Sequence, residues 1–386
     1  MGFEVMSDIE KEREGWREKA REVAKNVVAP RAAEIDAKGE FPWDIVDTFW
    51  KNGFLSLLIH EEYGGKDSDI TSFCHVVEEI SSYCVSSALS IVAHTVGLMP
   101  IIVAETKEPK DKVLPRVVKE RALVCFCLTE PDAGSDAASI RTKAVFKDDH
   151  YLLNGRKCFI TNGGVSDFYT VFAVTHPERK MEGITGFVIG KGAPGLSVGK
   201  TEEKMGIRGS NTTEVVLEDV KVPVSQRIGD EGVGWWLMMR TLNRSRPAIG
   251  ALATGLALGA LNYLIQSGKE KGWFRIKNGA LGVRAKLADM AVEIEAARAL
   301  VYKSARMMDE KVKGTPVQMY SAMSKYFSSD VAMKVTTEAV QILQWEGLTR
   351  NHPVERMMRD AKVIQIFEGT NQVQRMVVAH TLLKAK

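Results

Sequence analysis

The sequence predicts a mainly α-helical protein with a central β domain. Apolar residues recur at helical spacing early in the chain, give way to short runs rich in β-branched and aromatic residues, and then return to helical spacing. This order lacks the alternation of strands and helices that a doubly wound nucleotide-binding sheet requires. We therefore expect three domains: a helical domain over residues 1–121, a β domain over 122–232 and a helical bundle over 233–386.

The first helical stretch extends to about Arg121. Apolar or small side chains follow one another every three or four residues, with charged residues between them, at Trp16, Ala20, Val23 and Val27. Proline and paired glycine interrupt the pattern at Pro30, Pro42 and Gly64–Gly65. The stretch is therefore expected to fold as several helices with short connections.

The middle stretch, from about Ala122 to Gly232, contains runs that are typical of strands: YLLNGRKCFITNG, DFYTVFAVTH, ITGFVIG and TEVVLEDVKV. Asn154–Gly155 lies between two apolar runs, and both residue types accept the positive φ of a type I′ turn. We therefore expect a β-hairpin that turns at Asn154–Gly155.

The third stretch begins at Val233, and its segment LADMAVEIEAARALVYKSARMM again shows helical spacing. Within it, Pro247–Gly268 has no charged residue and is long enough to cross a membrane. However, this segment contains several polar residues and repeated glycines, and dense helical patterns flank it. We expect a helix buried between other helices and no membrane span.

Composition argues against several other classes of protein. The formal net charge of +3 over 386 residues is spread without a basic block, so no nucleic-acid groove is expected. Five cysteines without a CxxC pair argue against a disulfide framework and against a metal site. The N-terminal residues lack the apolar core of a secretory signal and the character of a transit peptide, which favours a cytoplasmic location or an already processed form.

A polar turn follows the run VCFC at the junction of the first two domains. Pro131 and Gly134 force the chain to turn, and Thr129 and Ser135 stand beside backbone N–H groups. Such groups can donate hydrogen bonds to the edge of a planar cofactor or to a phosphate. Taken alone, the pattern favours the simpler interpretation of a capped turn, by about two to one.

The run KCFITNG is a second candidate site. On a strand, Phe159 and Thr161 lie on the same face, where an aromatic ring and a hydroxyl could cover and hydrogen-bond a ring system. Packing of Phe159 in the core is the commoner explanation of such a pair.

The third candidate site lies near the C-terminus, in PVERMMRDAKVIQIFEGTNQVQR. Pro353 can start a helix and Gly369 can end it, and its apolar stripe consists of Val354, Met357, Met358, Ala361 and Ile364. Thr370 or Asn371 can then cap the next helix. Glu368 thus sits at a break between helices, where burial would raise its pKa, although a solvated loop carboxylate is the alternative.

Together, these segments resemble the acyl-CoA dehydrogenase family. Its two signatures are matched by CLTEPDAGSDAAS and by the C-terminal run above, with KCFITNGG, MGIRGSNTTEVVLEDVKVP and LADM in the expected order. TVGLMPIIVAE and NRSRPAIGA are most similar to the medium-chain members. The resemblance implies an N-terminal helical domain, a β-barrel or sandwich middle domain and a C-terminal four-helix bundle, assembled as a homotetramer.

The resemblance also implies an activity, the α,β-dehydrogenation of an acyl-CoA thioester to a 2-enoyl-CoA. Glu368 resembles the base that takes the α proton, while hydride passes to N5 of FAD and the electrons then pass to an electron-transfer flavoprotein. Relatives that carry the base on an earlier helix have Glu where this chain has Ser245, so Glu368 is the candidate base.

Further site residues follow from matching positions. Those that resemble FAD contacts of the family are Phe126, Leu128, Thr129, Gly134, Ser135, Phe159, Ile160, Thr161, Lys271, Phe274, Gln341, Trp345, Thr370 and Gln372. Those that resemble acyl-CoA contacts are Ser135, Asn243, Arg246 and Gly369.

The chain departs from the family at positions that contact the ADP end of FAD. Lys271 replaces an arginine and loses its bidentate fork, Leu281 replaces a glutamine, and Gln344 with Trp345 replaces a pair of glycines. Two alternatives therefore stand beside the main prediction. The chain could be one subunit of a heteromeric acyl-CoA dehydrogenase, or a flavin-free acyl-CoA-binding protein or lyase that keeps only the proton abstraction.

Overall fold

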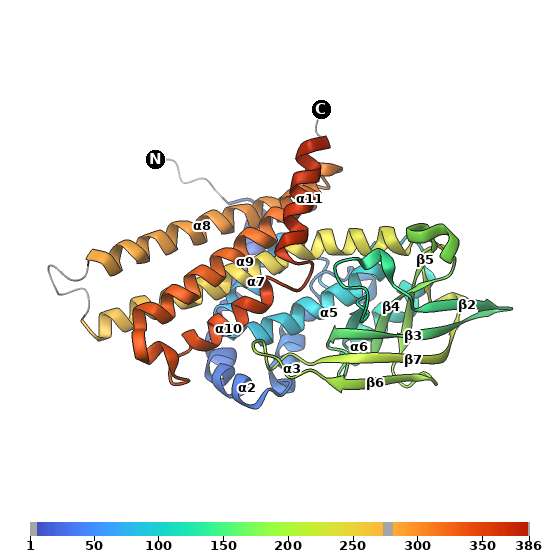
Figure 1. Cartoon of the computed structure of the whole chain (residues 1–386), viewed down its shortest axis with the longest axis horizontal. Helices are drawn as coiled ribbons and strands as arrows, with labels where there is room; N and C mark the ends of the chain where they lie inside the picture. Colours follow the sequence, from blue (N-terminus) through green and yellow to red (C-terminus); the bar gives the residue numbers. More distant parts are fainter. Residues whose placement is uncertain (1–5, 273–280, 385–386) are drawn as a thin grey trace.

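The computed structural model describes residues 6–272 and 281–384 (Figure 1). The N-terminal part is helical, as predicted, and its α-helices are α1 (Asp8–Val23), α2 (Ala32–Lys38), α3 (Trp43–Asn52), α4 (Ile70–Ser81), α5 (Val85–Val103) and α6 (Glu108–Glu120). Helix α1 begins with a capping box, because the Ser7 side chain accepts from the backbone of Glu10 and the Glu10 side chain accepts from the backbone of Ser7.

The middle part is one mixed sheet. Its strands are β1 (Val124–Cys127), β2 (Lys143–Lys147), β3 (His150–Thr161), β4 (Phe168–Val174), β5 (Ile184–Gly190), β6 (Leu196–Thr201), β7 (Thr212–Pro223) and β8 (Arg227–Ile228). The strand order is β6-β7-β3-β2-β4-β5-β8, and β1 runs parallel to β4. Strands β6 and β8 each pair with one neighbour only, so the sheet is open and the closed-barrel form of the middle domain does not occur within the described residues.

The hairpin expected at Asn154–Gly155 is wrong. Strand β3 continues through both residues, and the turn from β2 to β3 lies at Asp148–Asp149, where Lys147 pairs with His150. The β3–β7 register shifts between Leu153 and Gly155, which marks a bulge. A Cβ at Gly155 would lie 2.4 Å from Thr142 Oγ1, so close approach of the neighbouring strand explains this glycine better than a turn does.

The C-terminal part is a helical bundle formed by α7 (Gly234–Glu270), α8 (Leu281–Asp309), α9 (Thr315–Leu343), α10 (Val354–Ile364) and α11 (Asn371–Lys384). The long helices α7, α8 and α9 run side by side, and the sheet lies beyond one end of this bundle (Figure 1). Helices α5 and α7 are long and apolar enough to cross a membrane, but 94% and 72% of their most apolar windows are buried inside the protein. Pro247–Gly268 therefore forms part of a core helix, as expected.

Helix α7 approaches α4 very closely through two glycines. A Cβ at Gly259 would lie 2.0 Å from the carbonyl oxygen of Ser82, and one at Gly255 would lie 2.2 Å from that of Glu78. Contacts this short leave no room for any side chain. The small residues of α7 therefore fix the distance between the N-terminal helices and the C-terminal bundle.

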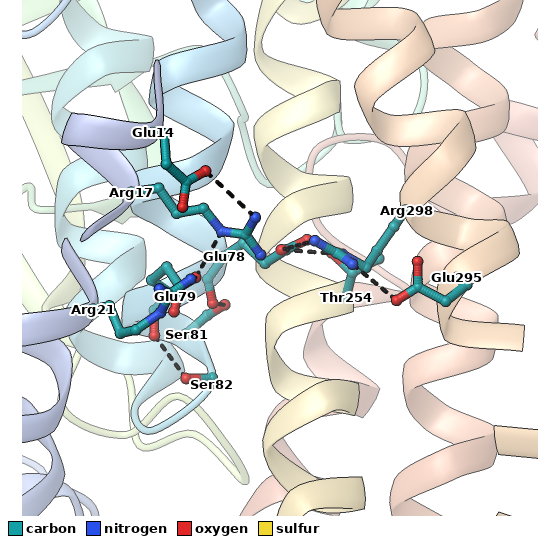
Figure 2. Close-up of polar contacts among 10 residues, drawn as sticks. All are labelled: Glu14, Arg17, Arg21, Glu78, Glu79, Ser81, Ser82, Thr254, Glu295 and Arg298. Carbon is teal, nitrogen blue, oxygen red and sulfur yellow. Dashed lines mark hydrogen bonds and ion pairs between the residues drawn. The ribbon is translucent and has the colours of Figure 1, made fainter. Parts of the chain in front are cut away.

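A buried polar network crosses the same junction (Figure 2). The carboxylate of Glu78, on α4, is 2% exposed and accepts from Thr254 Oγ1 of α7 at 2.9 Å. It also accepts from Arg298 Nε of α8 at 3.1 and 3.2 Å. A buried charge is tolerated only when it is paired and hydrogen-bonded, so this network specifies how three helices meet.

We predict that Gly259→Ala destabilises the protein by about 1–3 kcal/mol, because the added methyl group overpacks a rigid backbone contact. This loss exceeds the gain in helix propensity, which is at most about 1 kcal/mol. The measurement is the free energy of unfolding in urea. Gly15→Ala is the matched control, since Gly15 lies in helix α1 with no atom within 4 Å of an added Cβ, and it should stabilise slightly. Equal effects of the two substitutions would contradict the close contact.

Candidate active site

Glu368 lies on a turn between two helices, as the sequence predicts. Helix α10 ends at Ile364 after burying the apolar stripe, and α11 begins at Asn371 with Thr370 Oγ1 accepting from Val373 N at 3.2 Å. Glu368 has φ 56° and Gly369 has φ 84°, so both residues are left-handed. This conformation is uncommon for glutamate and costs about 1–3 kcal/mol.

Two buried side chains hold this turn through its carbonyl oxygens. Gln374 Nε2 donates to the carbonyl oxygen of Glu368 at 3.3 Å and to that of Gly369 at 3.1 Å. Lys325 Nζ also donates to Gly369 O, at 2.9 Å. A Cβ at position 369 would lie 2.4 Å from Gln374 Nε2, so the turn needs glycine for its space as well as for its φ.

The carboxylate of Glu368 is half-buried and points toward helix α7. Ser245 Oγ donates to its Oε2 at 3.2 Å. Burial raises the pKa of Glu368 above its usual value, while the charge of Arg246, the hydrogen bond from Ser245 and the charge of Lys325 act in the opposite direction. A carboxylate with a raised pKa is a stronger base than an exposed one, which suits it to proton abstraction.

Arg246 lies beside this carboxylate inside the protein. Its side chain is 6% exposed, and its Nη1 donates to Asn243 Oδ1 at 2.8 Å. Its Nε has no hydrogen-bond partner among the described residues. Burial lowers the pKa of Arg246 to about 10, against the charge of Glu368. Asn243 and Arg246, predicted as acyl-CoA contacts, thus lie together at the base.

Lys325 of α9 is a buried charged residue beside the candidate base that the sequence analysis does not predict. Its side chain is fully buried, and its Nζ donates to Asn371 Oδ1 as well as to Gly369 O, both at 2.9 Å. Burial lowers its pKa to about 7, and the charge of Glu368 opposes this. The signal was present in SAMSKYFSSDVA, where Lys325 shares one helix face with Ser321, Ser328 and Ala332, all fully buried.

The residues predicted to face the flavin ring lie at the end of β1 and along β3. Cys158 N donates to Thr129 O at 2.9 Å, and the buried Lys157 Nζ donates to Leu128 O at 3.2 Å and to Glu130 Oε1 at 2.7 Å. These bonds bring the two predicted segments together. No hydrogen bond or ion pair among the described residues joins them to Glu368.

Phe159 is not a core residue, because 64% of its side chain is exposed. It has φ 55° and lies where the β3–β7 register shifts. Thr129 and Thr161 are half-buried, while Gly134 and Ser135 are exposed in the turn after β1. An exposed aromatic ring with hydroxyls on neighbouring segments fits the face of a planar ring system such as a flavin. Leu128 and Ile160 are buried, so only their backbone atoms can face a ligand.

The residues predicted to contact the ADP end of FAD lie on other segments than the residues predicted to face the flavin ring. Lys271 forms an ion pair with Glu346 of the same chain, so its ammonium already has an anionic partner. Trp345 is 72% exposed and follows Gln344, whose φ is 57°. Gln341 and Gln372 are exposed. Phe274 lies outside the described residues, as does the side chain of Leu281.

A small apolar cavity of about 10 Å³ lies next to Ser245, on the inner side of the site. This volume holds about one water molecule. It is lined by Leu58, Ile70, Phe73, Val92, Thr95, Val96, Met99, Arg244 and Ser245. Ser245, which also bonds the candidate base, is the residue that this cavity shares with the surroundings of Glu368.

We predict that Glu368→Gln stabilises the protein more at pH 8 than at pH 4. A raised pKa means that ionised Glu368 destabilises the folded state, an effect absent below the unfolded pKa of about 4.3 and complete above the folded pKa. The gain in the free energy of unfolding from Glu368→Gln should therefore increase as pH rises. Urea unfolding of both proteins at the two pH values measures this, with Glu203→Gln, an exposed position, as control. A gain that does not grow with pH would contradict burial of the charge.

Comparison with known proteins identifies the family of the chain. Family models match over residues 10–121 (acyl-CoA dehydrogenase, N-terminal domain), 125–220 (middle domain) and 232–383 (C-terminal domain). The chain is 43% identical to a probable acyl-CoA dehydrogenase of Mycobacterium tuberculosis, over 97% of this chain and 96% of that protein. It is 42% identical to a cyclohexane-1-carbonyl-CoA dehydrogenase of Geobacter metallireducens, over 95% and 96%. The butyryl-CoA dehydrogenase structure from Megasphaera elsdenii superposes with a TM-score of 0.92 at 40% identity, over all of both chains. The chain therefore belongs to the acyl-CoA dehydrogenase family of oxidoreductases.

Proposed function

We propose that this protein dehydrogenates an acyl-CoA thioester to a 2-enoyl-CoA, with Glu368 as the base that takes the α proton. The observation that carries this proposal is the position of Glu368. It is a half-buried carboxylate on a left-handed turn, beside an apolar cavity, and its pKa is raised by burial. Such a group binds a proton more readily than a surface carboxylate does.

The enolate that forms when the α proton leaves needs stabilisation, because a C–H group beside a thioester is a very weak acid. A backbone N–H aimed at the carbonyl oxygen can supply part of it. The N–H of Glu368 has no acceptor among the described residues. We propose that it donates to the thioester carbonyl, while Arg246 and Lys325 limit the cost of the nearby negative charge.

We propose FAD as the cofactor, held against the exposed ring of Phe159 and the hydroxyls of Thr129 and Thr161. When bound there, FAD supplies the acceptor for the hydride that leaves the β carbon. The further proposed contacts are Phe126, Leu128, Gly134, Ser135, Ile160, Gln341, Thr370 and Gln372, and Gly369 and Ser135 are proposed acyl-CoA contacts.

The ADP end of FAD requires a separate proposal. Lys271 pairs with Glu346, and Trp345 exposes its ring close in sequence to the exposed Leu348. Exposed apolar side chains that lie together are typical of a contact with another chain. We propose that a second copy covers this end in a homotetramer. A different subunit is the second candidate, because these positions carry large side chains where the family has glycines.

The similar proteins support a proposal for the acyl group. The chain is similar to a butyryl-CoA dehydrogenase and to a cyclohexane-1-carbonyl-CoA dehydrogenase, so we propose a short or alicyclic uncharged acyl chain. The cavity of about 10 Å³ beside Ser245 is too small to hold such a group. Trp235 and Trp236, which stand near this region in the sequence, do not line the cavity. Trp236 is 47% exposed and packs under Arg240.

We further propose a cytoplasmic location and an electron-transfer flavoprotein as the electron acceptor.

We predict that the purified protein carries flavin at about one per chain, the stoichiometry of a one-site arrangement. The visible absorption spectrum, with flavin released by denaturation and quantified, measures this. A protein that is colourless and takes up no added FAD would overturn the flavin-dependent function and favour an acyl-CoA-binding protein or lyase. Flavin that is retained only after co-expression with a second subunit would favour the heteromer.

We predict that Glu368→Gln lowers dye reduction with butyryl-CoA at least about 1000-fold, since the amide cannot take a proton. Binding of butyryl-CoA, followed by the perturbation of the flavin spectrum, should change little because the side-chain volumes match. Glu203→Gln, at an exposed position, is the matched control and should keep full turnover. Unchanged turnover of Glu368→Gln would refute the assignment of the base.

A further inference from the structure

Lys325 places an ammonium group inside the protein, which is energetically unfavourable for a lysine. Its side chain has no exposed surface, although it lies on helix α9 within a long helical bundle. Burying an ammonium group costs several kcal/mol unless its hydrogen bonds and charge are compensated. Its Nζ has two acceptors, both at 2.9 Å: Gly369 O on the turn that contains Glu368, and Asn371 Oδ1 at the first residue of α11.

The hydrogen bonds alone do not explain this lysine. Gly369 O also accepts from Gln374 Nε2 at 3.1 Å, and the Asn371 side chain also bonds Ser329 Oγ. The turn would therefore keep partners for both oxygens without Lys325. Lys325 adds a positive charge next to the candidate base. Its hydrogen bond to Gly369 O also adds a second restraint, beside that of Gln374, on the left-handed turn at Glu368 and Gly369.

The charges around the pair come from three elements. Arg246 of α7 faces Glu368 and also lowers the pKa of Lys325. Asp330, one turn along α9 from Lys325, raises that pKa, but it is already paired with Arg375 and bonded by Gln365 and Asn371. Glu368 is thus the carboxylate beside Lys325 that is free to respond to its charge.

We propose that Lys325 is a positioning residue of the reaction: it holds the Glu368–Gly369 turn and keeps Glu368 ionised as the base. This inference rests on the proposed function. It assigns a role in proton abstraction to a residue that acts through Glu368, by one hydrogen bond to the turn and by its charge.

The test measures proton abstraction without redox turnover. The purified flavin-containing enzyme is incubated with butyryl-CoA in deuterated buffer, and exchange of the α hydrogens is followed by mass spectrometry between about pH 5 and pH 8. Lys325→Met, Lys325→Gln and Lys325→Arg are compared with wild type. Lys334→Met is the matched control, since Lys334 lies on the same helix and pairs with Glu293 at the surface.

We expect Lys325→Met to slow exchange at least about tenfold and to move the acidic limb of the profile upward by about 0.5 pH unit or more, because an opposite charge near a carboxylate lowers its pKa. Lys325→Gln should shift the acidic limb in the same way. Lys325→Arg keeps the positive charge, so its exchange rate and its acidic limb should lie close to those of wild type. Lys334→Met should match wild type.

An acidic limb that stays in place in Lys325→Met overturns the proposal, even if the protein is less stable, because a merely structural lysine would leave the limb unmoved. If Lys325→Met does not fold, an unshifted limb in Lys325→Gln has the same meaning. Wild-type enzyme that neither exchanges the α hydrogens nor reduces dye would instead refute the proposed function, so the two failures are distinguishable.

Discussion

The close packing of helix α7 is the constraint on which the rest of the structure depends. Gly255 and Gly259 bring its backbone against α4, and buried contacts with α5, α8 and α9 surround its other faces. The same helix carries Ser245 and Arg246 to the candidate base. Any widening of the α4–α7 contact would therefore move the residues that set the pKa of Glu368. Gly255 and Gly259 therefore fix the position of the helix that carries Ser245 and Arg246.

The turn at Glu368 combines three costs: a left-handed glutamate, a half-buried carboxylate and two buried cations. The packing beneath it offsets them. Helix α10 buries Val354, Ala361 and Ile364 completely, at about 1.5–3 kcal/mol for a large apolar side chain. The turn is thus held by the helices on both sides and by Gln374, so that the base keeps its orientation before the substrate arrives. Strained backbone that is held in this way is typical of pre-organised sites.

The sequence predicts the structure correctly where the local residue pattern and the burial of the segment agree. It predicted the helix–strand–helix order, the core role of Pro247–Gly268, and the break between helices that carries Glu368. It failed where long-range contact decides. Asn154–Gly155 has the composition of a turn, but Thr142, just before strand β2, leaves no room for a side chain at Gly155, and β3 continues through both residues. The sequence does not reveal Lys325, because lysine side chains normally lie at the surface. Only the fold shows that this face of α9 meets the turn after Glu368.

The two halves of the proposed chemistry are anchored by different means. The proton-abstracting half lies among long helices, and its polar groups are bonded within this chain. The hydride half lies at strand ends, where one buried ion pair between Lys157 and Glu130 links the two segments that would face the flavin ring. The contacts proposed for the ADP end lie on two segments, Lys271 just after α7 and Trp345 just after α9, and Lys271 is already paired with Glu346. Because Lys271 already has an anionic partner and Trp345 is exposed, we expect cofactor retention to depend on a neighbouring subunit more than proton abstraction does.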